Sequence, residues 1–298
     1  MIKDFDQLIK KVRSTKSPKV VALVAAEDTH SLEGVFQAEN DGIVRPILIG
    51  DEKKIHRALQ ELDVAGDYEI YNAPDPSEAA FKGVELVREG KAELLMKGKI
   101  QTATLLKAVV NKEKGLSKGN LMSHFVIQEV PTYHKLLVTT DGGMIMYPDL
   151  LQKKVIIENT VEVLRNMGYV KPKIGILAAV EKVNSKMPET VDAHELKQMN
   201  LKGEIKNCII EGPISYDLAM DKEAAMIKGY DSEVAGDVDV LIVPNITVGN
   251  VLGKSLVYSA KAKMAGCIIG AQCPIALTSR SSTAEEKYLS LALATVLI

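Results

Sequence analysis

The chain has 298 residues, of which 46% are hydrophobic and 26% are charged, and its net charge is −2. This length allows a large buried core and predicts about two domains. The near-neutral charge offers no basic surface to nucleic acid or to an anionic membrane, and the lack of Trp leaves few platforms for base stacking. Three cysteines without disulfide or metal-ligand spacing favour a cytoplasmic location.

The first 140 residues alternate between helical and strand patterns. Residues 1–14 predict a short amphipathic helix without the long apolar core of a signal peptide. The charged run of Lys10, Lys11, Arg13 and Lys16 is interpreted as a solvated helix face. No apolar run is long enough to span a bilayer. The patterns predict strands over 19–26, 45–50, 68–73, 92–98 and 136–140, and helices over 27–39 and 51–62.

The alternation restarts after a glycine-rich break at 141–149, so a domain boundary is expected near residues 140–147. A helix is predicted over 153–168, and strands are predicted over 173–180, 207–214, 238–245 and 265–271, with the apolar run 267–277 interpreted as buried strand. Near-continuous apolar strands separated by helices predict an α/β fold with a mainly parallel sheet covered on both faces.

The most informative segment is TSRSSTAEEKYLS, residues 278–290, which joins the last apolar run to a terminal helix. Ser282 with Glu285, and Thr283 with Glu286, are both capping-box patterns. Helix N-termini bind anions through free N–H groups and the helix dipole, and Arg280 adds a fork suited to phosphate or carboxylate. The segment therefore predicts an oxyanion or phosphate site, although an ordinary capped helix would give the same pattern.

Other predicted strands also end in small or polar residues, which gather along one edge of a parallel sheet. Turns use the same residue types for purely structural reasons. The candidates for substrate binding at these ends are Lys97, Gly98, Thr102, Gly212, Pro213, Ser215, Asn245, Gly249 and Asn250.

The sequence lacks the motifs of several other kinds of functional site. Neither GxGxxG nor GxxxxGK[ST] follows the first strand, which argues against the usual dinucleotide and nucleoside-triphosphate loops. The five histidines have no zinc-ligand spacing, so no metal site is predicted. Cys273 lies in an apolar run, where a thiol is usually buried and inert.

Five segments in order resemble the phosphate acetyltransferase/phosphate butyryltransferase family, and more closely its butyryltransferase branch. They are VALVAAEDTHSLEGV, EKVNSKMPETVDA, EGPISYDLA, VPNITVGN and LTSRSSTAEEKYLSLALA, which together extend over most of the chain.

The resemblance implies a two-domain α/β fold of the isocitrate/isopropylmalate dehydrogenase type, with the active cleft between domains. It implies domains of residues 1–140 plus 273–298 and of residues 141–272. It also implies reversible transfer of a short acyl group between coenzyme A and phosphate, which are substrates, with no bound cofactor and no metal. The expected partners are these small molecules and further copies of the chain, as a homodimer or larger homo-oligomer.

The resemblance also implies residue roles. In the acetyltransferase branch a Ser-Arg dipeptide contacts the phosphate and thiol region, and here Ser279 and Arg280 occupy it. That branch has a basic aspartate six residues after the arginine, whereas this chain has Glu286, with Glu285 beside it as the alternative base. Ser281, Ser282 and Thr283 are expected to bind substrate in the same turn.

Three other functions are possible for this sequence. The same enzyme class could prefer acetyl-CoA, because each methylene changes discrimination by only about 1 kcal/mol or slightly more. The fold could also serve as a non-catalytic acyl-CoA-binding module, although the chain keeps Ser279, Arg280 and both glutamates. An oxidoreductase of the same fold would need clustered metal ligands and a nicotinamide site, which the sequence lacks.

Overall fold

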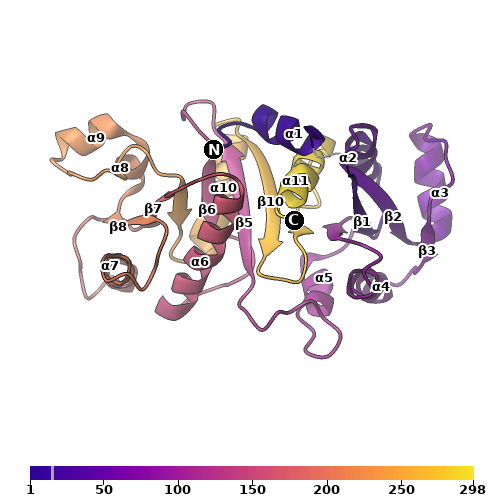
Figure 1. Cartoon of the computed structure of the whole chain (residues 1–298), viewed down its shortest axis with the longest axis horizontal. Helices are drawn as coiled ribbons and strands as arrows, with labels where there is room; N and C mark the ends of the chain where they lie inside the picture. The colour runs from indigo at the N-terminus through magenta and orange to yellow at the C-terminus, as the bar shows by residue number, and fades with distance from the viewer. Residues whose placement is uncertain (15–16) are drawn as a thin grey trace. The chain divides into compact units, whose positions relative to one another are not determined.

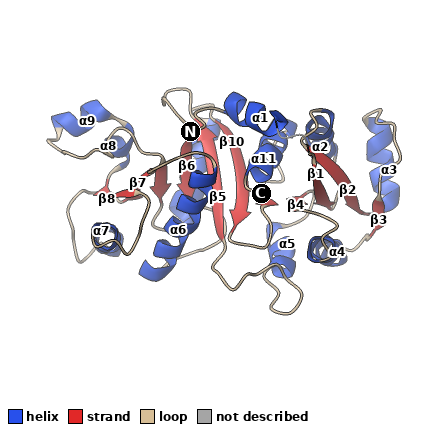
Figure 2. Ribbon diagram, viewed as in Figure 1, coloured by secondary structure: helices blue, strands red, loops and turns tan. Residues whose placement is uncertain are grey.

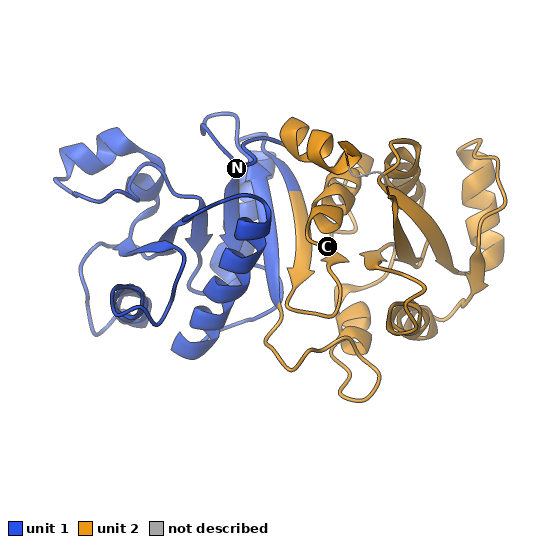
Figure 3. Ribbon diagram, viewed as in Figure 1, with its two compact units in different colours: residues 1–4, 123–264 blue, residues 5–122, 265–298 orange. Residues whose placement is uncertain are grey.

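Strands and helices alternate through the described part of the chain, residues 1–14 and 17–298, in the computed structural model (Figures 1 and 2). Lys16, predicted to belong to a solvated helix face, lies outside the described residues. The chain divides into unit 1, residues 1–4 and 123–264, and unit 2, residues 5–122 and 265–298 (Figure 3). Among the described residues, no helix combines the length and apolar character needed to cross a membrane.

Unit 2 contains a sheet with strand order β3-β2-β1-β4-β11-β10. All neighbours in it pair in parallel except β10 and β11, which are antiparallel. The strands are β1 (Lys19–Val24), β2 (Val44–Gly50), β3 (Ile70–Asn72), β4 (Leu94–Lys97), β10 (Lys263–Ile269, of which all but two residues belong to this unit) and β11 (Ile275–Ala276).

Helices cover both faces of this sheet. On one face α1 and α2 pack against α11, and α4 and α5 pack together on the other (Figure 1). The apolar residues of β1 and β4 are buried as a result, which explains why their sequences are almost continuously hydrophobic. The helices are α1 (Phe5–Ser14), α2 (Thr29–Asn40), α3 (Glu52–Glu61), α4 (Pro76–Arg88), α5 (Thr102–Val109) and α11 (Ala284–Val296).

Unit 1 contains strands in the order β5-β6-β9-β7-β8, with only β5 and β6 antiparallel. Helices α6 and α7 pack together, whereas residues of α8, α9 and α10 share a hydrophobic cluster with β8 and β9. The elements are β5 (Ser123–Glu129), β6 (Leu137–Thr140), α6 (Leu150–Asn166), β7 (Lys173–Leu177), α7 (Pro188–Leu201), β8 (Ile209–Ile214), α8 (Tyr216–Met220), α9 (Lys222–Ile227), β9 (Val240–Ile242) and α10 (Ile246–Tyr258).

Two details differ from the sequence interpretation. The apolar run 267–277 is not one strand, because the chain turns at Gly270, with φ of +85°, and returns as β11 antiparallel to β10. The unit boundaries fall at 122/123 and 264/265, whereas the predicted ones fall at 140/141 and 272/273. The β5–β6 hairpin joins the unit 1 sheet because β6 pairs with β9, with Val138 opposite Val240.

Candidate active site

The carboxyl ends of β4 and β11 lie next to each other in unit 2. The two strands pair in parallel, with Ala276 opposite Met96, so Lys97 at the end of β4 is level with the beginning of the 278–283 loop. Helix α11 follows that loop, and α5 follows β4. The structure thereby brings together ten predicted residues from two distant segments: Lys97, Gly98, Thr102, Ser279, Arg280, Ser281, Ser282, Thr283, Glu285 and Glu286.

The 278–283 loop presents several hydroxyl groups. Ser279 and Ser281 are exposed, and their Oγ atoms lie 3.0 Å apart. Thr278 and Ser282 are only 5% and 3% exposed, and among the described residues neither hydroxyl has a hydrogen-bond partner. Buried polar groups are normally satisfied, so two unpaired hydroxyls beside the exposed Arg280 indicate a ligand-binding loop.

Of the two predicted capping patterns, the structure uses the second. The Thr283 Oγ1 atom accepts a hydrogen bond from the backbone N–H of Glu286 at 3.2 Å and caps α11. Ser282 is therefore not the cap, and its buried hydroxyl is left without a partner among the described residues. Glu285 is exposed and Glu286 is half-buried in the first turn of this helix, directly after the loop.

Two buried lysines lie beside this loop. Lys97 is 1% exposed, and its ammonium group donates one long hydrogen bond of 3.3 Å to the carbonyl of Gly98. Burial lowers its pKa to about 8, and the positive charges of Lys287 and Arg280 act in the same direction, while Asp28 opposes them. Lys287 and Arg280 are therefore both close enough to Lys97 to disfavour its charged form.

Lys287 comes from the first turn of α11 and is also 1% exposed. Its Nζ atom donates to Ser31 Oγ at 2.9 Å, and burial lowers its pKa. Helix α2 can approach this side chain because residue 34 is glycine, and a Cβ atom there would lie 2.9 Å from the Cβ of Lys287. Asp28 caps α2 through Oδ1, whereas its buried Oδ2 has no hydrogen-bond partner among the described residues.

Gly98 has a packing role that the sequence did not specify. Its N–H donates to the carbonyl of Val24 at 2.8 Å, and a Cβ atom would lie 2.3 Å from the carbonyl oxygen of Ala25. Thr102 begins α5, whose N-cap Gln101 makes no side-chain capping hydrogen bond. This helix terminus therefore keeps backbone N–H groups available at the same sheet edge.

The remaining predicted residues belong to unit 1, at the ends of β8 and β9. Asn245 caps α10 by accepting a hydrogen bond from the N–H of Val248. Gly249 lies against the backbone of Gly142, where a Cβ atom would come within 2.6 Å, and Asn250 is exposed. These contacts give Asn245 and Gly249 structural roles. The binding roles of Asn245, Gly249 and Asn250 stay predictions.

Ser215 has acidic surroundings. Its hydroxyl lies 2.5 Å from Glu181 Oε1 and 2.6 Å from Asp217 Oδ1, so carboxylates occupy its hydrogen-bonding positions. Lys228 pairs with Asp217, and its hydrogen bond lowers the pKa of that carboxyl to about 2. Gly212 packs against Ile176 and Ala193, next to Pro213 in β8. This neighbourhood suits a phosphate less well than the cationic edge of unit 2.

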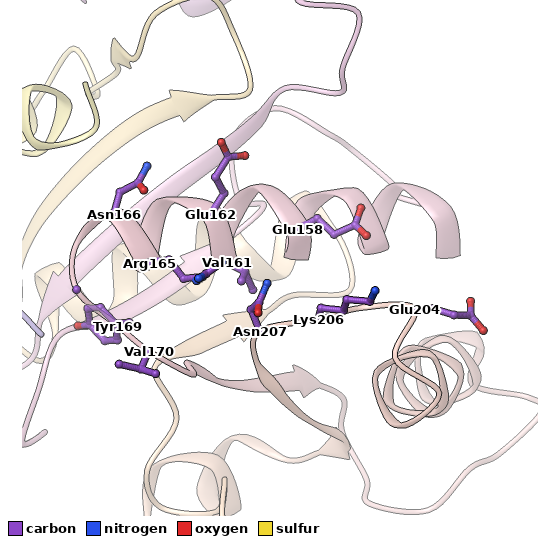
Figure 4. A pocket seen from close by; sticks show the side chains of 11 residues that line it. Glu158, Val161, Glu162, Arg165, Asn166, Tyr169, Val170, Glu204, Lys206 and Asn207 are labelled. Carbon is purple, nitrogen blue, oxygen red and sulfur yellow. The ribbon is translucent and has the colours of Figure 1, made fainter.

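A hollow of about 660 Å³ in unit 1 is separate from all predicted residues (Figure 4). It lies between the second half of α6 and the segments that precede β7 and β8, which places it at the amino ends of those strands. Ligands of open α/β sheets bind at the carboxyl ends, so this hollow is not the candidate active site.

Cys273 is 6% exposed, and burial raises the pKa of its thiol to about 12. A thiol in that state is a poor nucleophile at neutral pH. Among the described residues, no group of three or more His, Cys, Asp or Glu side chains is arranged to hold a metal ion.

Sequence reasoning did not assign Lys287, Asp28 or Ser31 to the site. Asp28 could have been found, since an acidic residue directly after a buried strand is a frequent helix cap. Lys287 gave no amphipathic signal, because α11 is buried on all sides from Lys287 to Thr295.

Comparison with known proteins identifies the family. The family described as "Phosphate acetyl/butaryl transferase" matches residues 76–295. The phosphate butyryltransferase of Clostridium acetobutylicum is 43% identical over 99% of this chain and 98% of its own, and the phosphate acetyltransferase of Thermotoga maritima is 41% identical over 93% and 95%. The crystal structure of a branched-chain phosphotransacylase from Enterococcus faecalis V583 superposes with a TM-score of 0.80 at 32% identity, over 94% of this chain and 98% of that one.

The comparisons thus show a phosphate acyltransferase, and its α/β architecture is of the dehydrogenase-like type, as the sequence resemblance implied. The chain belongs to the phosphate acetyltransferase/phosphate butyryltransferase family.

Proposed function

We propose that the protein reversibly transfers a butyryl group between coenzyme A and inorganic phosphate: butyryl-CoA + phosphate = butyryl phosphate + CoA. Family membership supports the reaction class, and phosphate butyryltransferases among the similar relatives favour the butyryl chain. The observation that carries the assignment to a site is the convergence of Arg280, Lys97 and Lys287 around the hydroxyl-rich loop at one sheet edge. Such an edge suits a dianionic phosphate.

In the direction of acyl-CoA synthesis, the thiol of coenzyme A loses its proton and its sulfur attacks the carbonyl carbon of butyryl phosphate. A C–S bond forms, the C–O bond to the phosphoryl group breaks, and the proton ends on the departing phosphate. A free thiol has a pKa of about 8.5, so a general base accelerates the attack. Glu286 or Glu285, in the first turn of α11, serves as that base.

Arg280 and the loop hydroxyls hold the phosphate in this scheme. The guanidinium can donate two parallel hydrogen bonds to phosphate oxygens. Ser279 orients the thiol or donates to the tetrahedral oxyanion, and Ser281, Ser282 and Thr283 contact the substrate in the same loop. Both substrates bind together, and the acyl group passes directly between them without a covalent intermediate on Cys273.

We further propose that the enzyme needs no bound cofactor, works in the cytoplasm, and assembles as a homodimer or larger homo-oligomer. Three free, buried cysteines support a reducing compartment. Gly212, Pro213, Ser215, Asn245, Gly249 and Asn250 of unit 1 contact the substrates in this proposal.

The acyl chain is tested by a length series. The rate constant kcat/KM is measured for acetyl-, propionyl-, butyryl-, isobutyryl- and valeryl-CoA with saturating phosphate. The proposal predicts a maximum at butyryl-CoA, with acetyl-CoA lower by roughly tenfold or more, because two methylenes in an apolar pocket contribute about 1 kcal/mol or more each. A maximum at acetyl-CoA would instead assign the chain to the acetyltransferase activity.

A further inference from the structure

The ammonium groups of Lys97 and Lys287 are buried without a carboxylate partner. Each side chain is 1% exposed, and among the described residues neither forms an ion pair within 4.0 Å. Together they make two hydrogen bonds, both to neutral oxygens. Buried charges in proteins are normally paired with an opposite charge, since an isolated one is costly to desolvate.

The neighbouring carboxylates do not remove this imbalance. Asp28 is near enough to favour the charged form of both lysines, but its Oδ1 caps α2, and its Oδ2 has no hydrogen-bond partner among the described residues. Arg280 adds a third positive charge from the loop. Glu286, in the first turn of α11, also favours the charged form of Lys287. Two carboxylates beside three cations leave an excess of about one positive charge at a place enclosed by β4, α2 and α11.

The other buried lysines of the chain show the contrast. Lys135 in unit 1 is 7% exposed and contacts Asp237 and Asp239 at 2.8 and 2.7 Å. Lys153 is 5% exposed and contacts Asp192 at 2.6 Å. The chain therefore pairs its structural buried lysines, and Lys97 and Lys287 are the exceptions among the described residues.

We propose that Lys97 and Lys287 form a cationic pair that binds the phosphoryl dianion, as inorganic phosphate in one direction and as the phosphoryl group of the acyl phosphate in the other. This inference rests on the proposed function and assigns two binding residues to it. Arg280 holds the same dianion from the exposed side of the loop. The Ser282 hydroxyl, buried in the same loop without a hydrogen-bond partner among the described residues, donates to one of the phosphate oxygens.

The pair has a chemical consequence for transfer. When the C–O bond of the acyl phosphate breaks, negative charge grows on the oxygen that leaves with phosphorus. Fixed ammonium groups in a site shielded from water stabilise that charge more strongly than they would in solvent. Lys97 and Lys287 therefore favour departure of phosphate in one direction and orient phosphate for attack in the other.

The test measures phosphate binding without turnover. Inorganic phosphate is titrated by calorimetry into the full-length wild type and into Lys97→Met and Lys287→Met, which keep most of each aliphatic stem. The control is Lys107→Met, which removes the same charge from an exposed position on α5. We expect each buried variant to bind phosphate at least tenfold more weakly and the control to bind it like the wild type. Wild-type affinity in both buried variants would overturn the proposal.

A second titration, with coenzyme A and with its form lacking the 3′-phosphate, distinguishes the possible sources of the phosphate. Unchanged coenzyme A affinity in the buried variants places inorganic phosphate at the pair, as proposed. A loss confined to coenzyme A, absent for the form lacking the 3′-phosphate, would overturn this assignment in favour of the 3′-phosphate of coenzyme A. If methionine prevents folding, Lys97→Gln and Lys287→Gln replace it.

Thermal unfolding provides a readout that a purely structural role would not give. Without phosphate, the buried variants should melt at or above the wild-type Tm, because they lack an unpaired buried charge. Phosphate should raise the Tm of the wild type and of Lys107→Met, but hardly that of the buried variants. Because neither experiment requires acyl transfer, phosphate binding at the pair without any transferase activity would refute the proposed function alone.

Discussion

Replacing Lys97 with methionine should stabilise the protein at neutral pH. This stabilisation should disappear at alkaline pH. Burial, together with Lys287 and Arg280, lowers the pKa of Lys97 from 10.5 to about 8, against the opposing charge of Asp28. Between these values the folded state binds fewer protons than the unfolded state, so the stability of the wild type rises with pH. A pKa difference of this size corresponds to about 3 kcal/mol in the free energy of unfolding. Allowing for solvent screening, we expect Lys97→Met to be more stable than the wild type by about 2 kcal/mol at pH 7.

The assay is urea unfolding of the wild type, Lys97→Met and Lys107→Met at pH 7, 8, 9 and 10, in buffers free of phosphate. The variant's advantage in the free energy of unfolding should be largest at and below pH 7 and should shrink from pH 8 upward. Lys287, whose pKa is also lowered, titrates in both proteins, so the difference mainly reports Lys97. A constant difference across this range, or a Lys97→Met protein that is less stable throughout, would refute the electrostatic reasoning.

Three further substitutions test the site. Glu286→Gln or Glu285→Gln should lower kcat about a hundredfold at whichever position holds the base, and near-wild-type turnover in both would exclude a carboxylate base. Arg280→Ala should raise the KM for phosphate at least tenfold in steady-state kinetics, with little change in the KM for coenzyme A. A folded variant with the phosphate kinetics of the wild type would show that Arg280 does not bind phosphate. Gly34→Ala brings a Cβ atom within 2.8 Å of the Ala284 carbonyl, so urea unfolding should show about 1–3 kcal/mol of destabilisation, and an unchanged midpoint would contradict the close packing of α2 on α11.

The class of fold follows from the sequence because its strands are buried on both faces. Runs such as residues 19–24 are hydrophobic at almost every position, which only a covered, mainly parallel sheet requires. The β10–β11 hairpin was missed because its two strands and turn read as one apolar run, although Gly270 and Pro274 interrupt it.

The loop at 278–283 was likewise predictable, since its hydroxyls, arginine and capping pattern are contiguous. The sequence did not show which of Ser282 and Thr283 caps α11, because both have a glutamate three residues later. The proximity of Lys97 and Lys287 could not be predicted, since it arises only through the pairing of β4 with β11 and the packing of α2 on α11. Contacts of this kind depend on tertiary structure and leave no local pattern.

The most direct test of the central claim is release of free thiol from butyryl-CoA by the purified protein, with and without inorganic phosphate. We expect thiol release that requires phosphate and rises to saturation with phosphate concentration, accompanied by butyryl phosphate in equal amount. A folded protein that binds butyryl-CoA but releases no thiol in the presence of phosphate would contradict this claim and would indicate an acyl-CoA-binding module instead.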